Sequence, residues 1–193
     1  MSGQIHAVLK TTYGNITIRL LPLRAPKTVR NFVELAEGTR EWKDPATGQP
    51  GSGPYYDGTL FFRVMRWHPL LPLEMRLIWG GDPLNNGRGG PGYKFADEID
   101  PGLTFDQPYL LGMANAGPGT NGSQFFITAA PCPELTGKHT IFGNVSQGTE
   151  VVDRIANVPT GANDRPVTDV VLQSVTINRA GNGPIGRLWW RGR

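Results

Sequence analysis

The chain has 193 residues, of which 38% are hydrophobic and 18% charged, and this balance argues against both a disordered chain and a membrane protein. Its 26 glycines and 17 prolines are scattered without a collagen period, which excludes a long helical bundle and favours many turns between short strands. The net charge of +3 derives from residues 179–193, because residues 1–178 hold 15 basic and 16 acidic residues. A polyanion-binding surface on the body of the chain is therefore not expected.

The first predicted elements are two strands and a helix. Residues 6–12 and 15–20 flank a Tyr-Gly turn, and the second segment alternates apolar and polar side chains. This pattern predicts a hairpin with one buried face. A helix follows, because Pro26 suits a first helical position, apolar residues then recur at helical spacing, and Gly38 is a typical helix end.

The rest of the chain is dominated by short apolar segments. A polar loop over 39–58 comes first. Segments typical of strands then lie at 59–65, 77–79, 109–114, 124–129 and 140–145. A second helix is predicted over 149–157, with Val151, Val152 and Ile155 facing inward, and a last strand over 168–178. Without internal repeats or an interdomain linker, these elements indicate one mainly β barrel or sandwich with two helices.

Several common kinds of site are not expected. Two segments, 87–92 and 117–122, match G-x-G-x-x-G, but neither follows a strand and opens a helix, so tight turns explain them better than a nucleotide. The three histidines are far apart and lack cysteine or carboxylate partners at ligand spacing, so no metal or other cofactor is predicted. The lone Cys132 excludes an intrachain disulfide and is predicted to be an ordinary loop residue.

The location predicted for the protein is cytoplasmic. Its N-terminal residues lack the apolar stretch of a signal peptide. No apolar run approaches the ~20 residues that span a bilayer.

Four segments carry a specific resemblance. They are TLFFRV at 59–64, GGDPLNNGRGGPGYKFADE at 80–98, MANAGPGTNGSQFFIT at 113–128 and GKHTIFG at 137–143. Together they resemble the cyclophilin family of peptidyl-prolyl isomerases, over roughly residues 5–178. The resemblance implies an eight-stranded antiparallel β-barrel capped by two α-helices. It also implies cis-trans isomerisation of X–Pro bonds, assisting protein folding without a cofactor.

The resemblance also assigns site residues. Arg63 is the expected catalytic donor, and a guanidinium suits this role because it stays charged and holds its N–H groups in a rigid fork. The implied substrate-binding residues are Ala114, Asn115, Gln124, Phe126, Leu135, His139 and Leu77. Among these, an apolar pocket for the proline ring is expected from Phe126, Leu135 and His139, while Asn115 pairs with the peptide backbone through its main chain.

The sequence departs from the family pattern next to Arg63. Phe62 replaces a histidine, and residues 65–79 form an insertion in place of a stretch of seven. Counted back from Gly80, Trp79 occupies the position of a glutamine that orients the catalytic arginine, and Arg76 occupies that of a phenylalanine in the pocket wall. The sequence therefore leaves an alternative open, a module that binds proline peptides with little turnover. Leu77, at a methionine position, still suits an apolar pocket.

The partners expected from the sequence are proline-containing peptides and unfolded proteins, met by a monomer. Neither nucleic acid nor a membrane is an expected partner. Glu134 stands where cyclosporin-sensitive members carry tryptophan, so weak cyclosporin binding at most is predicted. The isomerase domain is placed at 1–178 and a basic, tryptophan-containing tail at 179–193. The tail has two interpretations, a partner-binding element or poorly constrained sequence.

Overall fold

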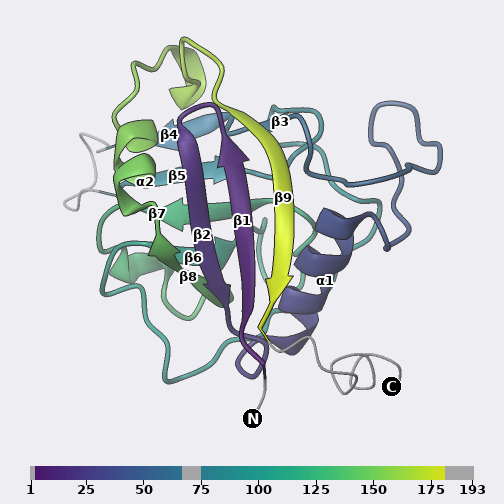
Figure 1. The fold of residues 1–193 in the computed structure, drawn as a ribbon, viewed down its shortest axis with the longest axis horizontal. Helices are drawn as coiled ribbons and strands as arrows, with labels where there is room; N and C mark the ends of the chain where they lie inside the picture. The colour runs from purple at the N-terminus through teal and green to yellow at the C-terminus, as the bar shows by residue number, and fades with distance from the viewer. Residues whose placement is uncertain (1–2, 67–74, 181–193) are drawn as a thin grey trace.

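The computed structural model describes residues 3–66 and 75–180, which contain nine strands and two α-helices (Figure 1). In chain order these elements are β1 (Ile5–Thr11), β2 (Gly14–Leu20), α1 (Pro26–Glu37), β3 (Thr59–Leu60), β4 (Arg63–Met65), β5 (Leu77–Gly80), β6 (Leu110–Met113), β7 (Phe125–Thr128), β8 (Ile141–Gln147), α2 (Thr149–Ala156) and β9 (Val171–Arg179). Two 3₁₀ turns, η1 (Pro133–Leu135) and η2 (Ala162–Asp164), precede β8 and β9.

All nine strands form one antiparallel sheet in the order β3-β9-β1-β2-β8-β6-β7-β5-β4. In Figure 1, β2, β1 and β9 cross in front of the other strands at a steep angle, so the sheet curls around its core. The predicted mainly β barrel with two helices is confirmed. The sheet has nine strands where eight were expected because the apolar run 59–65 is divided at Phe61 and Phe62. Its first part pairs with β9 and its second part with β5.

Helix α1 begins at Pro26 and ends before Gly38, which adopts a left-handed φ of 70°, as predicted. Its first backbone N–H groups have no partner within the helix. The carboxylate of Glu98 accepts hydrogen bonds from them, at 3.1 Å from Lys27 N and 2.6 Å from Thr28 N. A negative charge is favourable at this end of a helix, so Glu98 ties α1 to the segment that leads into the site.

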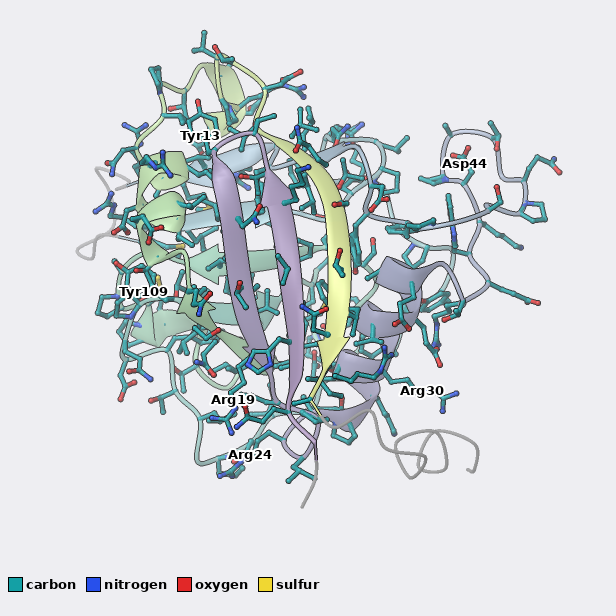
Figure 2. All side chains as sticks on the ribbon, in the orientation of Figure 1. Tyr13, Arg19, Arg24, Arg30, Asp44 and Tyr109 are labelled. Carbon is teal, nitrogen blue, oxygen red and sulfur yellow. The ribbon has the colours of Figure 1, made fainter. Side chains whose placement is uncertain are left out.

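Helix α2 lies at the opposite side of the sheet from α1 (Figure 1). Val151, Val152 and Ile155 are buried, as their spacing predicted. The hydroxyl of Tyr109, labelled at the left of Figure 2, donates to Asp153 of this helix at 2.9 Å. Among residues 3–66 and 75–180, no helix is long and apolar enough to span a bilayer.

Alternation along the strands sends apolar side chains into two clusters. On β7, Phe125 and Ile127 join the main core, whereas Phe126 points to the other face of the sheet. On β5, Ile78 and Leu77 divide in the same way. The second cluster, called here the outer cluster, consists of Leu77, Phe105, Leu110, Ala114, Phe126, Cys132 and Ile141.

The last strand continues past the boundary expected at residue 178. Arg179 pairs with Ile5 at the end of β9, and its guanidinium donates to both carboxylate oxygens of Glu37 on α1, at 2.6 and 3.0 Å. The body of the domain therefore includes Arg179. Residues 181–193 of the predicted tail and residues 67–74 of the predicted insertion lie outside the described residues.

Candidate functional site

A row of three side chains crosses the outer face of the sheet. Arg63 on β4 pairs directly with Trp79 on β5, and Trp79 pairs directly with Phe126 on β7. Directly paired residues share a face, and adjacent strands are about 4.8 Å apart. Arg63 and Phe126 therefore stand about 10 Å apart on one surface, with the indole between them. The register brings together the catalytic residue and the pocket residue expected from the sequence.

Trp79 contacts the face of the Arg63 guanidinium, and Asp164 contacts one end of it. The guanidinium carbon lies 5.5 Å from the centre of the Trp79 ring. Its Nη2 lies 3.5 Å from a carboxylate oxygen of Asp164 in η2, a long and half-exposed ion pair of the kind that stabilises little. Its Nε is shielded from solvent and has no hydrogen-bond partner in the described part of the chain. A buried donor without a partner is costly, and here it lies on the face that carries the candidate pocket.

Trp79 forms a hydrogen bond that the sequence did not indicate. Its indole N–H donates to the side-chain oxygen of Gln124 at 3.0 Å. The amide nitrogen of Gln124 in turn donates to the carbonyl of Gly89 at 2.8 Å. An indole N–H and a guanidinium are both donors and form no hydrogen bond with each other; Trp79 contacts Arg63 through its ring face instead.

Most of the residues expected to hold a proline ring gather at the outer cluster. The rings of Phe126 and His139 meet edge to face, with centres 5.4 Å apart and planes at 87°, and Phe105 lies beside Phe126 with ring centres 5.6 Å apart. Nδ1 of His139 is 2.9 Å from the Met113 carbonyl oxygen, which fixes the imidazole. Half-buried Leu135 packs against the same cluster. The structure thus brings Leu77, Ala114, Phe126, Leu135 and His139 together.

Asn115 is placed beside this pocket with its main chain free. Its side-chain nitrogen donates to the carbonyl of Lys138 at 3.0 Å, and its side-chain oxygen accepts the N–H of Gly117 at 3.2 Å. Asp97 braces the same loop by accepting hydrogen bonds from Gly119 N and Asn121 Nδ2 at 3.0 and 2.8 Å. Within residues 3–66 and 75–180, the main-chain N–H and C=O of Asn115 have no partner. These two groups are available to an extended peptide.

The side chain of Arg76 points away from the outer cluster. Its guanidinium donates to the side-chain oxygen of Asn157 at 2.9 Å, at the end of α2. The Ala129 N–H donates to the Arg76 carbonyl at 2.8 Å, so Arg76 extends the pairing of β5 with β7, and alternation along the strand turns its side chain to the face opposite that of Leu77. Met65 and Met75 pack against the outer cluster, to which Phe105 belongs. These three could not be found from the sequence, because none lies in a segment that carries the resemblance.

Other features add no reacting group to the site. Cys132 is buried in the outer cluster, and burial raises the pKa of its thiol to about 11, so it is almost wholly protonated at neutral pH. A hollow of about 580 Å³ opens beside β6 and β8, lined among others by Leu103, Tyr109 and Asn144. None of the predicted site residues lines it. In the described ranges, no three His, Cys, Asp or Glu side chains gather as a metal site.

Comparisons with known proteins agree on one family. The family model described as cyclophilin type peptidyl-prolyl cis-trans isomerase/CLD matches residues 6–177. Peptidyl-prolyl cis-trans isomerase B of Streptomyces anulatus is 60% identical over 180 residues, covering 92% of this chain and 98% of its own. Peptidyl-prolyl cis-trans isomerase A of Mycobacterium tuberculosis (strain H37Rv) is 53% identical over 175 residues, covering 89% and 91%.

Solved structures give the same result. The crystal structure of a cyclophilin type peptidyl-prolyl cis-trans isomerase from Cryptosporidium parvum is 32% identical, with a TM-score of 0.74, and the match covers 91% of this chain and 98% of that one. A second structure of that protein, in the presence of the dipeptide Ala-Pro, gives a TM-score of 0.73.

Proposed function

The chain belongs to the cyclophilin-type peptidyl-prolyl cis-trans isomerases, and from that premise we propose that Arg63 is the group that stabilises the twisted X–Pro amide. Resonance makes the amide planar and sets a barrier of ~18–20 kcal/mol. In the twisted transition state the prolyl nitrogen becomes pyramidal and gains an available lone pair. A fixed cationic donor aimed at that nitrogen binds the transition state better than the planar ground state, which is what lowers the barrier.

One observation carries this proposal: Arg63 lies on the same face of the sheet as Phe126, and its side chain is 38% exposed there. A charged donor that is partly exposed can form a charge-assisted hydrogen bond to a bound substrate. The guanidinium is also held before substrate arrives, by Trp79 on its face and by Asp164 at Nη2. Donors that need not reorganise during the reaction give the largest electrostatic contribution to catalysis.

The remaining site residues have a role in binding the chain. We place the proline ring against Phe126, Leu77 and Leu135, with Ala114 in the pocket floor and the His139 ring at its edge. The imidazole shapes the pocket rather than transferring a proton, because isomerisation breaks no bond to hydrogen.

The peptide backbone is held beside that pocket. The free main-chain groups of Asn115 pair with the backbone of the substrate, and Gln124 holds the neighbouring strand of peptide. These contacts involve proline and backbone alone, so we expect broad specificity over proline-containing peptides and unfolded proteins. The cytoplasmic location and the monomeric state remain predictions.

The alternative of a binding module with little turnover is not favoured. That alternative depended on the departure of segment 65–79 from the family pattern. The identity to proteins named as peptidyl-prolyl isomerases is 60% over almost the whole chain. The register of β4 and β5 also keeps Arg63 on the face of the pocket despite the longer connection between them.

Shortening Leu135 tests the pocket. In Leu135→Ala we expect KM for a short Ala-Pro reporter peptide to rise by about 3- to 10-fold, the cost of losing a few apolar carbons from a specificity pocket. The catalysed rate is measured at low temperature by exchange NMR. Leu23→Ala is the matched control, because Leu23 is 81% exposed before α1. An unchanged KM in Leu135→Ala, or failure of the intact chain to accelerate exchange, would contradict the proposed arrangement.

Glu134 provides a test with an inhibitor. One of its carboxylate oxygens is shielded from solvent without a hydrogen-bond partner in the described residues. An apolar ligand that covers a carboxylate removes water from the charged group, which costs free energy. An indole at this position offers apolar area and an N–H donor instead. We expect Glu134→Trp to lower the cyclosporin concentration for half-inhibition by about tenfold or more, a gain of about 1.4 kcal/mol. Equal inhibition of both proteins would show that Glu134 does not limit binding.

A further inference from the structure

We infer that Trp79 is the positioning residue for Arg63, and that it aligns the guanidinium through the face of its indole while its ring N–H fixes Gln124. One side chain thereby sets two parts of the site, the donor to the reacting amide and an amide that holds the peptide. The inference rests on the proposed role of Arg63.

The sheet places the side chain of Arg63 beside that of Trp79. Arg63 and Trp79 are directly paired across β4 and β5, so their side chains leave the sheet side by side on one face. The guanidinium carbon is 5.5 Å from the ring centre, inside the ~6 Å at which a cation is attracted to an aromatic face. The contact is therefore set by the register of the sheet and does not depend on a loop.

The contact with the indole leaves the edge of the Arg63 guanidinium unoccupied by Trp79. A guanidinium carries its N–H donors around its edge, in one plane. A hydrogen-bonding partner at this position would occupy part of that edge, whereas the indole occupies only the face. Among the described residues, the edge forms the long ion pair with Asp164, and its Nε has no hydrogen-bond partner. Stacking can therefore orient Arg63 without occupying the hydrogen-bonding edge of its guanidinium.

The indole of Trp79 is itself held by Phe62 and Gln124. Phe62 is buried, and its ring centre lies 5.9 Å from that of Trp79. The indole N–H donates to the side-chain oxygen of Gln124, and the amide nitrogen of Gln124 donates to the carbonyl of Gly89. Phe62 and Trp79 are aromatic departures from the family pattern within the described residues near Arg63, and they contact each other. Phe62 thus supports the indole that contacts the guanidinium.

The test measures kcat and KM for a short Ala-Pro peptide in Trp79→Ala and Trp79→Phe. We expect Trp79→Ala to lower kcat about 10- to 100-fold, because a misplacement of about 1 Å can cost ~100-fold. Trp79→Phe keeps a ring face and should retain kcat within about threefold, while the lost N–H to Gln124 raises KM. Trp42→Phe is the matched control, since Trp42 packs against Tyr55 away from this row. Urea unfolding of each variant checks that it is folded.

A double-mutant cycle separates positioning from general damage. In the Arg63→Ala background, Trp79→Ala should cause no further loss of kcat, because the group that it positions is absent. The NMR signal of Arg63 Nε–H should also be shifted by the indole ring current in the intact protein and in Trp79→Phe to a smaller degree, and not in Trp79→Ala.

Two results would overturn the inference. One is the same loss of kcat from Trp79→Ala with and without Arg63, and the other is a loss in Trp79→Phe as large as in Trp79→Ala. If Arg63→Ala alone leaves kcat unchanged, the proposed function of Arg63 fails. That result is distinct from a failure of Trp79→Ala to lower kcat while Arg63→Ala does.

Discussion

Replacing Arg63 with lysine is expected to lower kcat for X–Pro isomerisation about 100- to 1000-fold, the cost of removing one preorganised donor from a site of this kind. Lysine keeps the positive charge but loses the planar fork and is a poorer partner for an aromatic face. Its ammonium would also be drawn toward the half-exposed carboxylate of Asp164, which already lies 3.5 Å from Nη2 of Arg63. The charge then remains in the cleft without pointing at the prolyl nitrogen.

The measurement is the exchange rate of a saturating Ala-Pro peptide by NMR, together with Kd by calorimetry. Kd should change by less than about threefold, because a group that acts only in the transition state contributes little to ground-state binding. Arg19→Lys is the matched control, because Arg19 is exposed on β2 (Figure 2). A kcat for Arg63→Lys within tenfold of the intact protein would show that charge alone suffices.

Phe32→Ala is expected to cost about 3–5 kcal/mol of the free energy of unfolding, the range for large aromatic side chains removed from a core. Phe32 on α1 is fully buried. Its ring centre lies 5.1 Å from that of Tyr56 and 5.6 Å from those of Phe125 and Phe142. One ring thus joins the helix to β7 and β8, and its loss leaves a cavity between them.

Urea denaturation measures this effect. Phe32→Leu, which refills most of the space, should cost less than about 2 kcal/mol, and Leu23→Ala at the exposed position should stay within about 0.5 kcal/mol of the intact protein. Because Phe125 and Phe126 point to opposite faces of β7, kcat of folded Phe32→Ala at low temperature should remain close to that of the intact protein. A loss of stability below about 1 kcal/mol would mean that the core closes around the missing ring.

Local signals explain why much of the fold could be predicted. Pro26 and Gly38 mark the ends of α1, and the alternation in 15–20 defines a strand with one buried face. The division of 59–65 into β3 and β4 could not be predicted, because a continuous apolar run does not reveal that its two parts pair with different strands. The cap of α1 by Glu98 was also invisible, since the two are distant in sequence and the contact depends on the tertiary fold.

The candidate site was predictable where the resemblance is dense and not elsewhere. The segments 113–128 and 137–143 place Asn115, Phe126 and His139, and the structure brings these together. The region before Gly80 was uncertain because the extra length of the connection allowed more than one register. Pairing of Arg63 with Trp79 settles the register. The direction of Arg76 and the bond from Trp79 to Gln124 follow from that pairing, and neither is encoded in a local pattern.

The segment 59–65, shared by both ends of the sheet, also bears on aggregation. Unpaired strand edges are templates onto which another extended chain can add by backbone hydrogen bonds. Here the two edge strands are the two- and three-residue halves of one segment. Gly80 of β5 approaches Leu60 so closely that a Cβ would lie 3.2 Å from its carbonyl oxygen, and η2 lies beside β4 through Asp164. A protein whose fold binds proline-containing peptides thus offers them very little open edge for strand addition.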